Sequence, residues 1–110
     1  MKKNRQVKRW DVWTADVEYE DAPGIVKNRP VLILDDEQSI ALVAKITSHE
    51  PRDGFEGEYA IAFWKLAGLE KKSTVRLSQR FRYKDTDLDS KLGELHPYDI
   101  MQIQRMLSSM

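Results

Sequence analysis

The chain has 110 residues, of which 41% are hydrophobic and 33% are charged, and this balance is typical of a globular domain rather than a disordered chain. Its 18 basic and 18 acidic side chains cancel to a formal net charge of zero. This argues against a protein that coats nucleic acid but leaves room for a local basic patch. Cysteine is absent and only two histidines are present, so we expect neither a metal nor a cofactor. A cysteine-free chain also fits a cytoplasmic protein.

The length predicts one domain over residues 1–110, with no linker and no internal repeat. Residues 1–9 are basic and are either a frayed, solvated terminus or an arm that attracts phosphate. A polar segment follows them, so this start does not resemble a signal peptide. No apolar run approaches the ~20 residues needed to span a bilayer, and we expect no contact with membranes.

The first predicted strand covers residues 10–17, where side chains alternate and Trp13 and Val17 should face the core. Residues 18–27 contain the turn signal Pro23-Gly24 and are predicted to form a loop.

Residues 28–49 are predicted to form the central hairpin of the fold. Two apolar runs rich in β-branched residues, 31–34 and 40–44, are separated by the polar residues 35–38, which are too few for a helix. Pro30 lies at the start of the first run, where a missing N–H does least harm to a strand. Arg29 precedes the first run and a Thr-Ser-His sequence, 47–49, follows the second. A cation, two hydroxyls and an imidazole should therefore converge at one edge of the hairpin.

The rest of the chain predicts further short strands and one helix. We expect a loop at 50–57, a buried strand at 59–64, a turn at 65–72, an alternating strand at 73–79, an irregular segment at 81–88 and a small strand at 91–95. Pro97 suits a first helical position, His96 a cap, and Ile100, Ile103 and Leu107 recur with helical spacing. The expected fold is mainly β with α: an SH3-like small barrel, or strongly bent antiparallel sheet, with a C-terminal amphipathic helix.

Polar residues at the predicted strands form a candidate site for phosphate chemistry. Its members are Arg29, Thr47, Ser48, His49, Arg76, Ser78 and Gln79. Guanidinium groups bind phosphate through forked hydrogen bonds, and hydroxyls and amides hold phosphate oxygens or base edges. Such a site can stabilise a pentacoordinate phosphorus while the 2′-OH of RNA attacks, with no need of a metal. His49 titrates near neutral pH and can move a proton.

A structural interpretation remains open for each of these residues. Arg76 fits equally a solubilising or ion-paired side chain on a strand. Arg29 fits equally an ion pair with Asp35 or Asp36 in a neighbouring turn. His49 fits an ordinary loop residue.

Three segments, in this order, resemble the MazF/PemK/Kid toxins of bacterial toxin–antitoxin pairs over almost the whole chain. They are R-W-D-V-W-T-A-D-V; R-P-V-L-I-L followed by A-L-V-A-K-I-T-S; and G-L-E-K-K-S-T-V-R-L-S-Q-R-F-R. The resemblance implies a homodimeric, cytoplasmic, metal-independent endoribonuclease that cuts single-stranded RNA at short sequences. It leaves a cyclic phosphate and a 5′-OH, and an antitoxin blocks it.

The resemblance also implies roles for individual residues. Arg29, Thr47 and Arg76 match catalytic positions, and Ser48 and Gln79 match RNA-binding positions. We place His49 and Ser78 with the RNA-binding residues. The sequence departs from the family at three places: Ser78 stands where an acidic residue is usual, Trp10 replaces a common glycine, and the loop before Arg29 differs.

Two other functions remain open. A protein-binding toxin on the same barrel, like the CcdB gyrase poisons, would grip a topoisomerase with its C-terminal helix and would not need the two arginines. A catalytically silent RNA- or protein-binding module would keep the fold alone.

Overall fold

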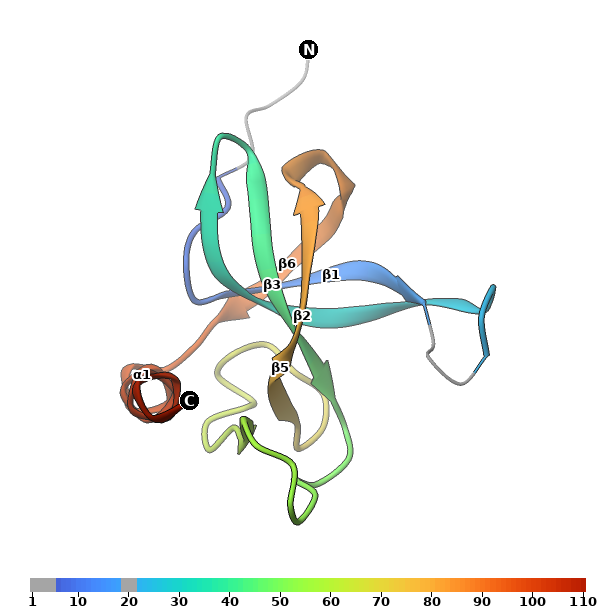
Figure 1. The fold of residues 1–110 in the computed structure, drawn as a ribbon. Coiled ribbons are helices and arrows are strands. Elements are labelled where there is room, and N and C mark those ends of the chain that lie inside the picture. The colour runs from blue at the N-terminus through green and yellow to red at the C-terminus, as the bar shows by residue number, and fades with distance from the viewer. Residues whose placement is uncertain (1–5, 19–21) are drawn as a thin grey trace.

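The computed structural model describes residues 6–18 and 22–110, which form a six-stranded antiparallel sheet and a C-terminal helix (Figure 1). The elements are β1 (Asp11–Glu18), β2 (Val26–Glu37), β3 (Ile40–Thr47), β4 (Glu58–Ala60), β5 (Thr74–Lys84), the 3₁₀ turn η1 (Asp85–Asp87), β6 (Leu88–Glu94) and α1 (Pro97–Ser109). The strands follow the order β4-β5-β3-β2-β1-β6. This architecture confirms the predicted fold class.

The long strand β2 bends the sheet. Its first part pairs with β1 from Val26 to Leu32, and its second part pairs with β3 from Val31 to Glu37, with an irregularity between Ile33 and Asp35. Figure 1 shows β2 lying along β1 before it turns to run beside β3. An irregularity of this kind bends a strand locally, so one strand serves both parts of the sheet.

The bent sheet buries both of its faces. One cluster contains Leu32 and Leu34 of β2 together with Ile103 of α1 and residues of β3 and β5. The other contains Val31 and Ile33 together with Trp13, Ala15 and Val17 of β1 and Leu88 of β6. Alternate residues of β2 therefore enter different clusters, which explains why residues 31–34 form an uninterrupted apolar run. The predicted burial of Trp13 and Val17 is confirmed.

The turn of the hairpin is tighter than we predicted. Residues 35–37 are not a connector, since Asp36 pairs with Ala41 and Glu37 with Ile40. The turn itself is Gln38-Ser39, whose φ angles are 53° and 64°. Two consecutive left-handed residues match the right-handed twist of the flanking strands, so a two-residue turn suffices.

The strand predicted at residues 59–64 is wrong beyond its start. β4 ends at Ala60, and residues 62–68 form turns. The cause lies far along the chain: the buried carboxylate of Asp99, in the first turn of α1, accepts hydrogen bonds from the backbone N–H groups of Ala62 (2.8 Å) and Phe63 (2.9 Å). These contacts draw the segment out of the sheet and toward the helix.

The prediction of an irregular segment at residues 81–88 is also wrong. β5 continues to Lys84 because its residues 80–84 pair with β3. Along β5, however, Arg76 pairs with Lys45 and the next pair joins Arg80 to Ala44, so residues 77–79 form a bulge with no partner in β3. β6 then covers Leu88–Glu94, which is longer than the strand predicted at 91–95.

The ends of the described chain follow local rules. The imidazole of His96 accepts a hydrogen bond from the N–H of Tyr98 (3.0 Å), and Pro97 begins α1, so the predicted cap and helix are confirmed.

Trp10 has a φ of 77°, a left-handed conformation that glycine adopts freely and other residues adopt at a cost of about 1–2 kcal/mol. This explains why glycine is common at that place in the family that the sequence resembles.

Two expectations lie partly outside the described residues. The basic start of the chain falls mostly on residues 1–5, and the loop predicted at 18–27 contains residues 19–21. Within the described part of that loop, Val26 and Lys27 already belong to β2. No helix in the described ranges has the length and apolar character needed to cross a membrane.

Candidate functional site

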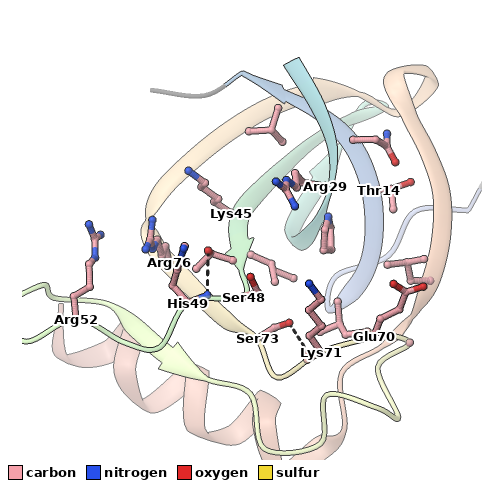
Figure 2. Close-up of a pocket in the computed structure, with 18 residues that line it drawn as sticks. Thr14, Arg29, Lys45, Ser48, His49, Arg52, Glu70, Lys71, Ser73 and Arg76 are labelled. Atoms are coloured by element: carbon pink, nitrogen blue, oxygen red, sulfur yellow. Dashed lines mark hydrogen bonds between the residues drawn. The ribbon is translucent and has the colours of Figure 1, made fainter. Parts of the chain in front are cut away.

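A pocket of about 690 Å³ opens where β2 begins and β3 ends (Figure 2). It is lined by Thr14, Val17, Asn28, Arg29, Pro30, Lys45, Ile46, Thr47, Ser48, His49, Arg52, Gly68, Leu69, Glu70, Lys71, Ser73, Arg76 and Leu92. Five of these side chains are Lys or Arg and one is a carboxylate, although the whole chain carries no net charge. We name this site the cation pocket. Its excess of positive charge suits an anionic ligand.

The hairpin brings Arg29 and Thr47 together as the sequence predicted. Val31 pairs with Lys45 in the β2–β3 register, so the start of β2 and the end of β3 lie at one end of the hairpin. Asp35 lies toward the opposite end of β2, so the geometry does not favour the ion pair that the sequence left open for Arg29. Figure 2 shows Arg29 and Lys45 reaching from neighbouring strands into the same opening.

The end of β3 contributes hydroxyl and imidazole groups to the pocket. The hydroxyl of Thr47 accepts a hydrogen bond from the backbone N–H of His49 at 3.3 Å, which holds the first residues after β3 in a tight turn. Thr47 is half-buried, whereas Ser48 and His49 are exposed. The three predicted residues therefore line the pocket at different depths, with Thr47 the most buried.

Arg76 enters the pocket from β5 and has an anionic partner. Its Nε lies 3.4 Å from Oε2 of Glu58, a contact within ion-pair range that is too long or poorly aligned for a hydrogen bond. The same carboxylate binds Arg52 through Nε (3.0 Å), Nη2 (2.5 Å) and the backbone N–H (2.9 Å). The hydrogen bond from the Arg52 side chain lowers the pKa of Glu58, against the effect of burial, so the carboxylate is charged at neutral pH.

Two predicted site residues do not line the pocket. Ser78 and Gln79 lie in the bulge of β5, which turns them away from the register that places Arg76 at the site. Ser78 is exposed, and Gln79 is half-buried with its side-chain oxygen lacking a hydrogen-bond partner in the described residues. A sequence alternation carried through residues 74–79 cannot reveal such a bulge.

Three cations of the pocket were not identified from the sequence: Lys45, Arg52 and Lys71. A signal existed for Lys45, because it interrupts the apolar run of β3 and lies two residues before Thr47, on the same face of the strand. Arg52 and Lys71 lie outside the strands, in segments whose path local patterns do not determine. Within the described residues, no three His, Asp or Glu side chains gather as metal ligands.

Comparisons with known proteins agree with this geometry. Residues 8–110 match the family model described as PemK-like, MazF-like toxin of type II toxin-antitoxin system. No curated protein sequence matches the chain. Among solved structures, an endoribonuclease from a mycobacterial species in complex with its cognate antitoxin is similar, with a TM-score of 0.69 and 17% identity over 94% of this chain and 93% of that chain.

Two further structures share the fold. A second mycobacterial endoribonuclease has a TM-score of 0.67 and 16% identity, covering 94% of this chain and 88% of that chain. The Mycobacterium tuberculosis toxin MazF-mt6 has a TM-score of 0.63 and 20% identity, covering 88% of this chain and 93% of that chain. At these identities the likeness establishes the fold, and the family model covers nearly the whole sequence. The chain therefore belongs to the family of PemK-like, MazF-like toxins of type II toxin–antitoxin systems, which confirms the resemblance of its three segments.

Proposed function

We propose that this toxin is an endoribonuclease that cleaves single-stranded RNA in the cation pocket. The observation that carries the proposal is the convergence of Arg29, Thr47 and Arg76 from three strands onto one pocket rich in positive charge. Strands hold such groups rigidly, and preorganised cations stabilise a charge that develops during reaction. The mycobacterial structures with this fold are endoribonucleases, which supports the same activity.

The proposed reaction uses the RNA's own 2′-OH as the nucleophile. Its oxygen bonds to the adjacent phosphorus and loses its proton, while the bond from phosphorus to the 5′ oxygen breaks and that oxygen gains a proton. The products are a 2′,3′-cyclic phosphate and a 5′-OH. The nucleophile comes from the substrate and the pocket supplies cations for the phosphoryl oxygens, so the step has no need of a metal ion.

Each residue has a role in this scheme. Arg29 and Arg76 neutralise the scissile phosphate, and Thr47 and Ser48 position it through their hydroxyls. His49, exposed at the rim, contacts the RNA and is the candidate for proton transfer. Ser78 and Gln79 are proposed as RNA contacts beyond the pocket, since neither lines it.

Cleavage of mixed single-stranded RNA in the presence of EDTA tests the proposal. We expect products with cyclic phosphate and 5′-OH ends at a short preferred sequence. An oligonucleotide with a single 2′-deoxy residue 5′ of the cleaved bond should resist cleavage there, because it lacks the nucleophile. Absence of cleavage of any RNA by the wild type would refute the proposal and favour a protein-binding toxin or a silent binding module.

We also propose three properties of the assembly: a homodimer, inhibition by a cognate antitoxin, and a cytoplasmic location. The complex of a structural neighbour with its antitoxin supports the second. The open edges of the sheet and exposed apolar residues such as Ile25 and Val26 support the first. Sedimentation should detect a species of twice 12.9 kDa, and only the 12.9 kDa species at micromolar concentration would contradict the dimer.

A further inference from the structure

Glu58 is a buried carboxylate that lies behind the cation pocket and does not line it. Its side chain is 2% exposed, whereas those of its partners Arg52 and Arg76 are 37% and 11% exposed. On the sheet Glu58 pairs with Arg76, which pairs on its other side with Lys45 of β3. Arg76 thus lies in a row of three charged residues across three strands.

This row has an electrostatic consequence for Arg76. Lys45 is a like charge directly across the sheet, and like charges in that position repel. Glu58 on the other side attracts the guanidinium through Nε. The two neighbours therefore act in the same direction and draw the guanidinium toward β4. Within the described residues the two Nη groups of Arg76 donate no hydrogen bond, so they can donate to a phosphate in the pocket.

Arg52 is held by the same carboxylate. Two side-chain nitrogens and the backbone N–H of Arg52 bind Glu58, which closes the segment between residues 52 and 58. Its guanidinium lies 3.7 Å from the ring centroid of Phe55, so the side chain is fixed by an ion pair and by a ring. One buried anion thus fixes two arginines that come from different parts of the chain and line the same pocket.

We propose that Glu58 is a positioning residue, which holds Arg52 and Arg76 as a pair facing the phosphate of the bound RNA. The proposal rests on the proposed RNA cleavage and adds Arg52 to the groups that contact the substrate. An anion beside a site for a polyanion weakens binding through its charge. Its benefit is therefore the orientation of the two guanidinium groups, which matters most in the transition state.

The variant Glu58→Gln tests this role, because it keeps the size of the side chain and an oxygen for the N–H of Arg52 but removes the charge. We expect single-turnover cleavage of a fixed RNA to fall by about 10- to 100-fold, the usual effect of misplacing a catalytic group. Binding of the same RNA with 2′-O-methyl groups, which cannot react, should be equal or tighter, because a negative charge has gone. Glu56→Gln is the control: it removes an equal charge from an exposed residue nearby and should leave both measurements unchanged.

This split between cleavage and binding separates positioning from a purely structural role. If Glu58 only closes the 52–58 segment, cleavage and binding will fall together and will follow the fraction of folded protein in a thermal melt. That result, or cleavage within threefold of wild type, would overturn the proposal.

Nuclear magnetic resonance of the arginine Nε–H groups gives a reading that does not depend on RNA cleavage. In Glu58→Gln, the signals of Arg52 and Arg76 should shift or exchange faster with water, whereas Glu56→Gln should leave them unchanged. Unchanged signals in Glu58→Gln would overturn the positioning role. If the wild type cleaves no RNA but these signals respond, the proposed function has failed, while Glu58 still positions the two arginines.

Discussion

The two ends of the β2–β3 hairpin carry opposite charges. At one end, Arg29 and Lys45 line the cation pocket with three further Lys or Arg residues. At the other end, the carboxyl of Asp36 lies near that of Asp85 in η1. The backbone N–H of Asp85 donates a hydrogen bond to the carbonyl oxygen of Ser39 in the turn. A formal net charge of zero for the whole chain therefore conceals a separation of charge along one hairpin.

The two ends relieve their like-charge repulsion in different ways. At the acidic end, burial, followed by a hydrogen bond and charge repulsion from Asp85, raises the pKa of Asp36 to about 6. Below about pH 6, a proton held by this pair of carboxyls therefore relieves their repulsion. Arginine and lysine side chains do not lose their protons near neutral pH. The repulsion among the cations of the pocket is therefore reduced only by anions. Glu58 is one such anion within the protein, and a bound ligand would be another. The difference supports the proposal that the pocket binds a polyanion.

The largest expected effect is at the cationic end, for Arg29→Ala. This variant loses a hydrogen-bond donor to the negative charge that develops on the phosphate in the transition state, so the rate of RNA cleavage should fall by about 100- to 1,000-fold. Arg29→Lys should restore little of that rate, because an ammonium group lacks the forked geometry of a guanidinium. The thermal melt should hardly change, since Arg29 is exposed and charge interactions at the surface contribute little to stability. Arg82→Ala, which removes an equal charge from an exposed part of β5 outside the pocket, is the control. Cleavage by Arg29→Ala within threefold of wild type would remove Arg29 from the site.

The next effect concerns the backbone that forms the wall of the pocket. Gly68 has a φ of 88°, and a Cβ atom there would lie 2.1 Å from the carbonyl oxygen of Leu92 in β6. Gly68→Ala should reduce the free energy of unfolding by about 2–3 kcal/mol, from left-handed strain and the clash together. Gly54→Ala is the matched control, with a φ of 78° and nothing within 4 Å, and should cost only the strain. Equal losses in urea unfolding would show that the contact with β6 is unimportant.

A smaller effect should distinguish the two ends in RNA binding. Lys71→Ala removes an exposed cation of the pocket, whereas Lys84→Ala removes an exposed cation at the end of β5, beside the acidic end. If Lys71 meets a phosphate, its loss should weaken binding of an uncleavable single strand by about 3- to 10-fold and reduce the slope of log K against log salt by about 0.7. Lys84→Ala should change neither quantity. Equal slopes for both variants would mean that RNA responds to the positive charge of the whole surface and not to that of the pocket.

The smallest effect is the pH dependence of the acidic end. The pKa of Asp36 is higher in the folded chain than its usual value of 3.8, so the folded state binds more protons between about pH 4 and 6. Its contribution to stability is complete below about pH 4 and is lost as the pH rises through about 6. Asp36→Asn should therefore gain stability relative to wild type between pH 4 and 7, on the order of 1 kcal/mol for a partly solvated pair. Glu37→Gln, an exposed neighbour, should show no such change in unfolding experiments at the two pH values.

Local patterns in the sequence were enough for much of the scaffold. The apolar runs of residues 31–34 and 40–44, the cap at His96 and Pro97, and the helical spacing of Ile103 and its neighbours each reflect interactions within a few residues. The hairpin follows from the same local signals, and it brings Arg29 to the same end as Thr47. The family assignment also needed only the sequence, since three short segments in order carry it.

Tertiary structure decided the remaining features of the site. Asp99 ended β4 early through bonds to residues 37 and 36 positions away, and the bulge at residues 77–79 turned Ser78 and Gln79 out of the pocket. Arg52 joined the site because one buried carboxylate, Glu58, binds it together with Arg76. These outcomes depend on which distant groups satisfy a buried charge or an unpaired N–H. Such pairings depend on the packing of the whole chain, so a pattern within one segment does not predict them.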